Sequence, residues 1–144
     1  MEKKFNDGQK CEFDICKTEK KWKKELWNRY EILRRKGTEA PFTGTFLYNK
    51  EKGVYVCGAC GNKLFSSETK FDSGTGWPSF SEVISNNKII LKQDNSRGMK
   101  RTEVLCKRCG SHLGHVFNDG PKPTGKRFCI NSWALNFVKR KNEK

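Results

Sequence analysis

Cys57-Gly58-Ala59-Cys60-Gly61 is the stretch of sequence that decides the fold, because Cys106-Lys107-Arg108-Cys109-Gly110 repeats its form, with 45 residues between Cys60 and Cys106. We call these the first and second knuckle. Two residues between the cysteines allow one tight turn to direct both sulfur atoms at the same point. The trailing glycine permits a backbone turn that a side chain would hinder. Four thiolates then complete the closed tetrahedral shell of structural Zn²⁺.

The knuckles therefore predict one structural zinc site with four ligands, Cys57, Cys60, Cys106 and Cys109. Their separation is longer than in a zinc ribbon, so the metal is expected to join two distant hairpins. Two CxxC redox pairs are the alternative. We favour zinc because thioredoxin-like pairs lie in a βαβ pattern, which this sequence lacks. A closed shell leaves no position for substrate, so a catalytic metal is not expected.

The composition is that of one domain with a modest core. The chain has 144 residues, of which 34% are hydrophobic and 32% are charged, and its net charge is +14. Such a charge favours anionic partners, but no basic stripe interleaved with aromatic residues is present. We therefore expect a solubilising surface and no specific nucleic-acid partner. A bound metal would add to the stability that the small hydrophobic core provides.

The sequence also favours a cytoplasmic protein. No stretch reaches the roughly 18 apolar residues of a membrane helix, so we expect no membrane association. The first seven residues, Met1 to Asp7, lack the apolar region of a secretory signal. In a reducing cytosol, seven cysteines indicate metal binding or redox catalysis more than structural disulfides.

A mainly β fold with an N-terminal helix follows from the periodicity. A helix is predicted over residues 19–36, capped by Thr18 and followed by Gly37, with an apolar stripe of Trp22, Leu26, Trp27, Tyr30 and Leu33. Short β-rich runs then alternate with turns, which indicates antiparallel sheets. The predicted strands are Thr45–Tyr48, Gly53–Cys57, Lys88–Lys92, Met99–Cys106, His115–Phe117 and Arg127–Val138.

Cys129 is the cysteine most suited to chemistry. In a strand, side chains alternate between two faces, so Arg127, Cys129 and Asn131 share one face, while Phe128 and Ile130 point to the other. A guanidinium nearby stabilises a thiolate, which is the reactive form. An inert buried cysteine is the alternative, but it would not need arginine and asparagine beside it.

Two further stretches hold candidate functional residues. His112 and His115 are the only histidines of the chain and directly follow the second knuckle, which would hold them rigidly. With four thiolates already present, they are not expected to bind the metal, and a histidine near a thiolate can transfer protons near neutral pH. The segment Phe71–Phe80 combines glycines with Trp77, whose large apolar face suits either core packing or a ligand.

Together these segments closely resemble the B-type methionine sulfoxide reductases, which reduce the R epimer of methionine sulfoxide. The resemblance extends from about Leu26 to Val138. It rests on seven segments: Gly37–Gly44, Gly53–Gly61, Phe71–Phe80, Cys106–Gly110, His112–Phe117, Asp119–Pro121 and Gly125–Asn131. It implies two antiparallel sheets in a tent-like arrangement. The chain then divides into a flexible segment 1–17, a single reductase domain 18–138 and a basic tail 139–144.

The resemblance also implies the roles of the site residues. The Cys129 thiolate would attack the sulfoxide sulfur, release methionine and become a sulfenic acid. Trp77 would hold the substrate methyl group. His112 and His115 would assist protonation of the sulfoxide oxygen. Asn131 would fix this network and Arg127 would favour the thiolate. The chemistry agrees, because the oxygen leaves poorly until it is protonated.

One position departs from the pattern of many family members. Thr75 stands where they have the cysteine that resolves the sulfenic acid as a disulfide. Some relatives use a cysteine near the N-terminus instead, and here Cys11 and Cys16 are available. Direct reduction by thioredoxin is the other route. We expect Cys11 or Cys16 to resolve Cys129, thioredoxin to be the reductant, oxidised proteins to be the substrates, and the chain to be a monomer.

Two other classes of function remain open at this point. The paired knuckles and the charge of +14 are compatible with a nucleic-acid-binding module. A zinc-dependent domain of chaperone type would share the architecture. Neither class would need Cys129 or the two histidines.

Overall fold

The N-terminal helical region is broken where the sequence predicts one continuous helix. The computed structural model describes residues 3–4 and 10–140 of the chain. Helix α1 (Glu19–Leu26) is followed by a 3-10 turn (Trp27–Arg29) and by α2 (Tyr30–Leu33). Thr18 caps α1 as predicted, since its hydroxyl oxygen accepts a hydrogen bond from the Lys21 N–H at 3.2 Å.

The prediction of a helix over residues 19–36 was therefore wrong in its length and at two positions. Trp27 has a positive φ of 49°, which ends the α-helical ladder, and it is 80% exposed, so it does not belong to the apolar stripe. The left-handed residue after α2 is Lys36 (φ 58°), not Gly37. The other stripe residues, Trp22, Leu26, Tyr30 and Leu33, are buried as predicted.

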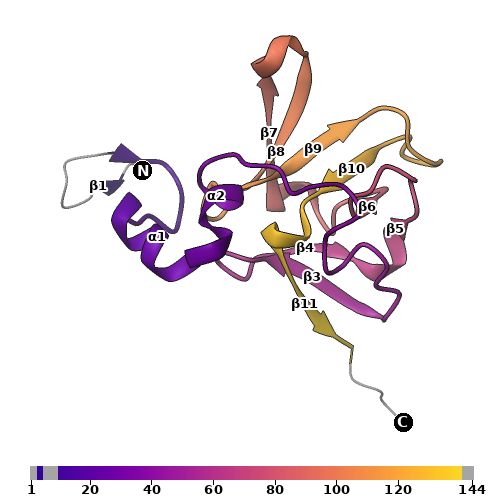
Figure 1. Cartoon of the computed structure of the whole chain (residues 1–144), viewed down its shortest axis with the longest axis horizontal. Coiled ribbons are helices and arrows are strands. Elements are labelled where there is room, and N and C mark those ends of the chain that lie inside the picture. Colours follow the sequence, from indigo (N-terminus) through magenta and orange to yellow (C-terminus); the bar gives the residue numbers. More distant parts are fainter. Residues whose placement is uncertain (1–2, 5–9, 141–144) are drawn as a thin grey trace.

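Two antiparallel sheets form the body of the molecule, as the sequence predicts (Figure 1). The smaller sheet has the order β11-β3-β4, and the larger has the order β5-β6-β10-β9-β8-β7. A short pair, β1 (Lys3–Lys4) and β2 (Lys10–Cys11), lies apart from both. The strands of the two sheets are β3 (Gly53–Cys57), β4 (Lys63–Ser66), β5 (Lys70–Phe71), β6 (Ser79–Phe80), β7 (Ile89–Asp94), β8 (Arg101–Cys106), β9 (His112–Phe117), β10 (Arg127–Ile130) and β11 (Leu135–Lys139).

Five of the six strand predictions need correction. Lys88–Lys92 is observed as Ile89–Asp94, and Met99–Cys106 begins two residues later, at Arg101. Residues 45–48 form a turn, although their composition is β-like. The predicted strand Arg127–Val138 is two strands, because the 3-10 turn Ser132–Ala134 moves the chain from the larger to the smaller sheet. The strand predicted from His115 begins three residues earlier, at His112. Gly53–Cys57 was predicted with its observed bounds.

An aromatic core fills the space between the two sheets. Tyr55 and Phe65 of the smaller sheet are fully buried with Phe80 of the larger sheet. The rings of Phe65 and Phe80 stack with centroids 4.4 Å apart, and Tyr55 meets Phe80 edge-on at 5.0 Å. Such pairs add roughly 0.5–1.5 kcal/mol each beyond the burial of their area. Since Phe80 lies beside β10, this packing fixes the strand that carries Cys129.

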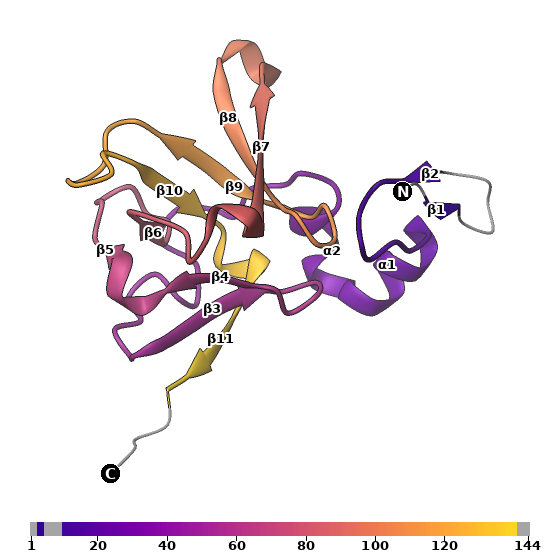
Figure 2. The ribbon, with the colours of Figure 1, turned by 180° about the vertical axis from the view of Figure 1, so that it is seen from behind.

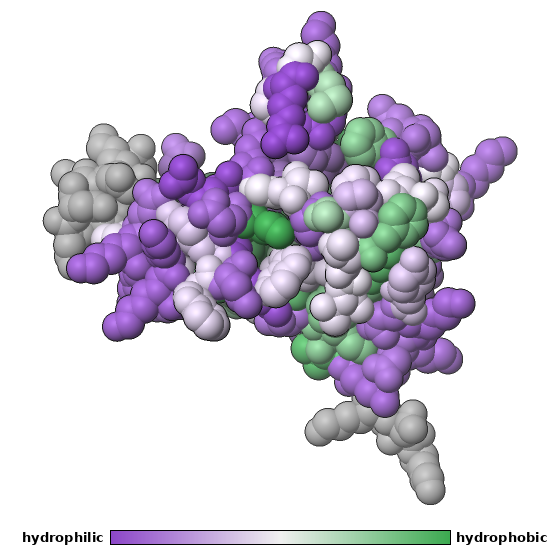
Figure 3. Space-filling model, in the orientation of Figure 1, coloured by the Kyte–Doolittle hydropathy of each residue, from purple (hydrophilic) through white to green (hydrophobic). Residues whose placement is uncertain are grey.

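The helical region and the larger sheet give the molecule two structurally different sides. The helical region lies at one side and the β6–β10 region at the other, while the β7–β8 hairpin projects from the body (Figures 1 and 2). On the face shown in Figure 3, α1 and the tip of this hairpin are hydrophilic, and the more hydrophobic colours gather over the middle and the β6–β10 side. In the part of the chain that is described, no helix has the length and apolarity needed to cross a membrane.

The division of the chain at residues 17 and 138 stays a prediction. Residues 11–17 lie on the second knuckle, where the Ile15 N–H donates to the Arg108 carbonyl at 2.9 Å. Of the predicted basic tail, Lys139 ends β11 and the Arg140 N–H donates to the Lys52 carbonyl at 2.8 Å. Residues 141–144 lie outside the described residues.

Candidate functional site

The four knuckle cysteines converge on one point. All four sulfur atoms lie within 4.8 Å of one another. The Cys57 and Cys109 sulfur atoms are 3.8 Å apart, and those of Cys60 and Cys106 are 3.6 Å apart. A tetrahedron with metal–sulfur bonds of about 2.3 Å has edges of about 3.8 Å, so this thiol group has the dimensions of a metal shell.

The knuckle turns place these sulfur atoms through their glycines. Gly61 and Gly110 have positive φ values of 80° and 77°, which side-chain-bearing residues rarely adopt. Their N–H groups donate to the Cys57 and Cys106 carbonyls at 2.8 and 2.7 Å. Each turn thus closes directly after the strand that leads into it, and the two turns face each other.

The helical region and neighbouring polar groups surround this thiol cluster. The Arg34 guanidinium donates to the Cys109 carbonyl at 2.8 Å and to the Ser111 hydroxyl at 3.1 Å. The Arg29 guanidinium donates to the Leu135 carbonyl at 3.0 Å, and the Asn62 amide lies 3.5 Å from the Cys106 sulfur. Two nearby arginines suit a shell of four thiolates around a divalent cation, because that shell carries net negative charge.

Cys129 lies in the middle of the larger sheet. Antiparallel pairing sets it opposite His115 of β9 on one side and opposite Ser79 of β6 on the other. Directly opposed side chains point to the same face of a sheet. A cavity of about 250 Å³ opens on this face and is lined by Thr38, Thr75, Trp77, Arg101, Gly114, His115, Phe117, Arg127, Cys129 and Asn131.

The cavity brings together most of the predicted site residues. Cys129, Arg127 and Asn131 share it as the strand alternation predicts, while Phe128 and Ile130 are buried on the opposite face. Trp77 and His115 also line it. His112 does not: it is buried behind His115, with the two rings edge-on and their centroids 5.5 Å apart.

Burial raises the pKa of the Cys129 thiol above its ordinary value, and the Arg127 charge opposes this shift only in part. The Arg127 guanidinium is shared with Asp119, to which it donates two hydrogen bonds at 2.8 and 3.1 Å. It also lies over the Phe117 ring, 4.4 Å from its centroid. The predicted influence of Arg127 on the thiolate thus has the expected direction, but the buried thiol is favoured at rest.

Both histidines are paired with buried carboxylates. His115 Nε2 lies 2.8 Å from Asp94 Oδ2, and His112 Nδ1 lies 2.6 Å from Glu103 Oε2. Burial lowers the pKa of His115, which Asp94 partly offsets. The hydrogen bond from His115, with further bonds from Ser96 and Lys36, holds the pKa of Asp94 well below its usual range. Among the described residues, the buried His112 Nε2 has no hydrogen-bond partner.

A loop from the N-terminal half fixes the tryptophan and the asparagine. The Trp77 Nε1–H donates to the Glu39 carbonyl at 3.0 Å, and the Glu39 N–H donates to Asn131 Oδ1 at 3.0 Å. The Asn131 Nδ2 donates to the Leu113 carbonyl at 3.1 Å. The Glu39 carboxylate is itself buried, accepts from the Trp133 N–H at 3.0 Å, and has its pKa raised by burial.

Thr75, which the family resemblance aligns with a resolving cysteine, lies beside Cys129. Its hydroxyl oxygen is 4.0 Å from the Cys129 sulfur and 2.8 Å from the Ser73 hydroxyl. The Ser73 hydroxyl is in turn hydrogen-bonded to the buried Ser79 hydroxyl, with the two oxygen atoms 2.7 Å apart. The segment around residue 75 thus lies beside Cys129, but it presents a hydroxyl group, which cannot form a disulfide.

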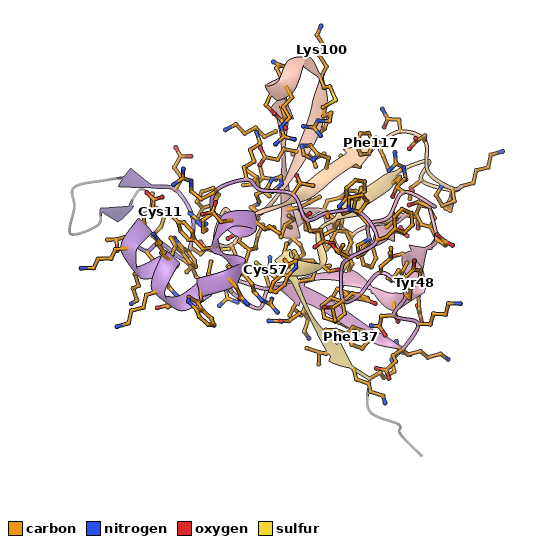
Figure 4. All side chains as sticks on the ribbon, viewed as in Figure 1. Cys11, Tyr48, Cys57, Lys100, Phe117 and Phe137 are labelled. Atoms are coloured by element: carbon orange, nitrogen blue, oxygen red, sulfur yellow. A yellow bond between two sulfur atoms is a disulfide. The ribbon has the colours of Figure 1, made fainter. Side chains whose placement is uncertain are left out.

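Cys11 and Cys16 form a disulfide with each other. Phe13, between them, lies so close to Gly110 that a Cβ there would come within 2.4 Å of its ring. In Figure 4, Cys11 and the cavity residue Phe117 lie on opposite sides of Cys57. The pair is therefore remote from Cys129 in this structure, and a bond to Cys129 requires this segment to leave the second knuckle.

Four charged or polar residues of the site were not predicted from the sequence: Lys36, Glu39, Asp94 and Glu103. Glu103 and Asp94 are 4% and 3% exposed, which is unusual for carboxylates unless they are paired. The one available signal was Glu103, an acidic residue on the inward-facing positions of a strand. Asp94 is the last residue of β7, and Glu39 lies within the segment Gly37–Gly44.

Taken together, a four-thiol cluster that can hold a metal and a separate thiol beside tryptophan and histidine define a thiol oxidoreductase on a mainly β fold. The SelR domain family matches residues 26–139. The chain therefore belongs to this family, the B-type methionine sulfoxide reductases that its motifs resemble.

Similar proteins come from distant organisms. The chain is 64% identical over 124 residues to the peptide methionine sulfoxide reductase MsrB of Methanosarcina barkeri, covering 85% of this chain and 87% of that protein. It is 56% identical over 128 residues to the protein of the same name from Leptospira interrogans, covering 88% and 98%. It is 52% identical over 140 residues to the mitochondrial methionine-R-sulfoxide reductase B2 of Homo sapiens, covering 92% and 76%.

Proposed function

We propose that this chain reduces methionine-R-sulfoxide, free or in oxidised proteins, to methionine, and that Cys129 is its nucleophile. The observation that carries the proposal is the position of the Cys129 thiol in a cavity that also presents Trp77 and His115. The knuckle thiols form a separate cluster and do not line this cavity. Cys129 is thus the cysteine that a substrate in this cavity would meet.

The first step transfers one oxygen atom. The Cys129 sulfur attacks the sulfoxide sulfur, and the substrate oxygen is protonated. The oxygen then moves from the substrate sulfur to the Cys129 sulfur, so one sulfur–oxygen bond breaks and another forms, and the transient sulfur–sulfur bond breaks as methionine leaves. Cys129 ends as a sulfenic acid, so the protein sulfur is oxidised by two electrons and the substrate sulfur is reduced by two. The proton lost by the thiol balances the proton that the oxygen gains.

His115 is placed to move this proton. It lies directly opposite Cys129 on the neighbouring strand, and its lowered pKa keeps the imidazole neutral and able to accept at neutral pH. As imidazolium it then donates to the sulfoxide oxygen. We assign His112 to the support of His115, against which it packs, and Asn131 to the fixing of the loop through Glu39.

Trp77 supports substrate binding. Its ring lines the cavity and its Nε1–H is held by the Glu39 carbonyl, so the indole face is kept in one orientation. An aromatic face provides a large apolar contact area for a methyl group. Arg127, beside Phe117, closes the other side and favours the thiolate when the proton leaves.

The four knuckle thiols would hold zinc. Their sulfur separations fit a tetrahedral shell, and thiolate ligands in a Cys₄ set are typical of structural zinc. When bound, the ion supplies cross-linking between the first and second knuckle. The chain's own contribution is to hold β8 and β9 in place through the second knuckle, immediately before His112.

The cycle closes by reduction of the sulfenic acid. We propose that Cys11 or Cys16, once reduced, condenses with Cys129 to form a disulfide and water, and that thioredoxin then reduces it. The hydroxyl of Thr75 cannot take this role. Direct reduction of Cys129 by thioredoxin is the alternative. Disulfide mapping after one turnover decides between them, since only the first route yields a Cys129 disulfide within the chain. We expect a cytoplasmic monomer.

The activity itself is tested with each epimer of methionine sulfoxide and dithiothreitol as reductant. The wild-type protein is expected to consume the R epimer only, and Cys129→Ser is expected to be inactive. The double variant Cys11→Ser/Cys16→Ser is the matched control, because dithiothreitol bypasses those cysteines and its activity should persist. Activity in Cys129→Ser, or consumption of the S epimer alone, would refute the proposal.

A further inference from the structure

Two buried carboxylate–imidazole pairs lie side by side behind the cavity. One joins Asp94 of β7 to His115 of β9, and the other joins Glu103 of β8 to His112 of β9. Glu103 is paired in register with His115 on the neighbouring strand, so the two sets share one face of the sheet. The side chains of Asp94 and Glu103 are only 2% and 5% exposed. Buried carboxylates of this kind require partners.

Lys36 connects the two pairs. Its ammonium lies 3.0 Å from Asp94 Oδ1 and 3.4 Å from Glu103 Oε1. The residue follows α2 and has a left-handed backbone with φ of 58°, a conformation that is uncommon for a residue with a side chain. This conformation lies at the point where the chain leaves the helical region and approaches the sheet. Among the described residues, Lys36 is the only cationic side chain that forms ion pairs with both carboxylates.

The oxygen atoms of Asp94 are divided between different donors. Oδ1 accepts from Lys36 and from the Ser96 N–H at 3.0 Å, whereas Oδ2 faces His115 and, at 3.6 Å, Arg101. With Oδ1 engaged in this way, the carboxylate cannot rotate away from the ring. A carboxylate only accepts hydrogen bonds, so the nitrogen facing it, His115 Nε2, must carry the hydrogen.

We propose that Lys36 is a positioning residue: it clamps Asp94 so that His115 keeps its hydrogen on Nε2 and leaves Nδ1 as its free nitrogen. This inference builds on the role of His115 in the proposed function. In that role, the nitrogen that receives the Cys129 proton is Nδ1. Lys36 acts through Asp94 and touches neither the substrate nor Cys129.

The charge around His115 gives Lys36 a second effect. The charged and titratable groups near this ring are Asp94, Glu103, Lys36, Arg101, His112, Cys129 and Arg127. Two carboxylates are balanced there by Lys36 and Arg101. Removal of the Lys36 ammonium leaves excess negative charge near the ring, which favours the imidazolium. The pKa of His115 is therefore expected to rise in its absence.

The test is a pH titration of the histidine ring nitrogens by long-range ¹H–¹⁵N NMR. The chain has only two histidines, and His112→Gln assigns their signals. In the wild-type protein, His115 is expected as the Nε2–H tautomer. In Lys36→Met its pKa should rise by about one pH unit and the two tautomers should mix. Lys36→Arg should restore the wild-type spectrum. Lys21→Met, whose lysine pairs with Glu25 on α1, is the matched control and should change neither property.

The result that overturns the proposal is equally direct. It fails if wild-type His115 carries its hydrogen on Nδ1, or if Lys36→Met leaves both the tautomer and the pKa of His115 unchanged. Activity is a separate readout, in which Lys36→Met should lower kcat and leave KM nearly unchanged. Since the NMR measurement needs no turnover, a protein without reductase activity would refute the proposed function and still permit this test.

Discussion

The knuckle cysteines and Cys129 carry the same thiol group in two different environments, a cluster of thiols and a cavity with a single thiol. Four sulfur atoms within 4.8 Å of one another form one group at the turns that follow β3 and β8. The Cys129 sulfur instead lies alone in β10, and it opens on a cavity of about 250 Å³. The knuckle thiols contact one another. Cys129 instead lies beside the Thr75 hydroxyl, opposite His115 on the next strand, in a cavity that is also lined by Trp77.

This difference shows what determines whether a thiol binds a metal or reacts with a substrate. Four sulfur atoms at tetrahedral spacing can complete the shell of a structural metal, which leaves no coordination position open for a substrate. A single thiol reached by a cavity keeps its reactivity, which then depends on burial and on nearby charge. Cys11 and Cys16 form a third setting, a disulfide outside both sites. The following predictions separate these settings.

The largest effect is expected from Cys106→Ser, which breaks the four-thiol cluster. A structural zinc site contributes roughly 10–16 kcal/mol of apparent binding energy to folding, which is as large as the whole stability of a domain. The variant should lose its metal and fail to fold. Metal analysis and circular dichroism measure this. Cys129→Ser is the matched control and should keep both its metal and its melting temperature.

Trp77→Ala should impair the cavity without affecting the cluster. Loss of a large apolar face is expected to raise KM for the sulfoxide by roughly 30- to 100-fold, which corresponds to about 2–3 kcal/mol. Steady-state kinetics with the R epimer measure this. Trp77→Phe keeps an aromatic face but loses the hydrogen bond to the Glu39 carbonyl, so its effect should be smaller. Equal KM values for the wild type and Trp77→Ala would exclude a binding role.

Asn131→Ala should lower the stability of the fold, because Asn131 holds the Glu39 loop against the strand that contains Leu113. It removes the acceptor of the Glu39 N–H and a donor to the Leu113 carbonyl, both buried. A buried group left without its partner costs about 1–3 kcal/mol. Urea unfolding measures the change in the free energy of unfolding. Asn136→Ala, at an exposed position of β11, is the control and should shift the midpoint little.

The smallest effect is expected from Arg127→Met, which removes the charge beside Cys129 together with the ion pair to Asp119. Burial raises the pKa of the Cys129 thiol and Arg127 opposes it, so removal of the guanidinium should raise this pKa further. Alkylation by iodoacetamide requires the thiolate, and its rate therefore increases as pH rises through the pKa. The midpoint of that profile should move upward by about half a pH unit to one unit. A downward movement would contradict the assignment.

The features that could be predicted from sequence are those that depend on local patterns. The knuckle spacing, the Thr18 cap and the strand alternation around Cys129 each depend on a few neighbouring residues, and each agrees with the structure. The segments that hold Trp77 and His115 were also marked from sequence, the family resemblance implied their roles, and both residues line the cavity. These signals are enough to predict the class of fold without any tertiary contact.

Features that depend on tertiary packing were missed. The left-handed residue Trp27 interrupts a stretch with good helical periodicity, and Ser132–Ala134 turns a β-rich run into two strands of different sheets. The carboxylates of Asp94 and Glu103 are buried because Lys36, distant in sequence, reaches both of them. No local pattern reports such a three-way charge contact, and none indicated that Cys11 would pair with Cys16.

The most direct test of the division between structural and reactive thiols is one turnover with methionine-R-sulfoxide. The fully reduced, metal-loaded protein is mixed with one equivalent of substrate without reductant. Its cysteines are then mapped by mass spectrometry and its metal is measured. We predict oxidation at Cys129, as a sulfenic acid or as a disulfide with Cys11 or Cys16, with the metal fully retained on the knuckle cysteines. Oxidation of Cys57, Cys60, Cys106 or Cys109 with release of metal, while Cys129 stays reduced, would contradict the account.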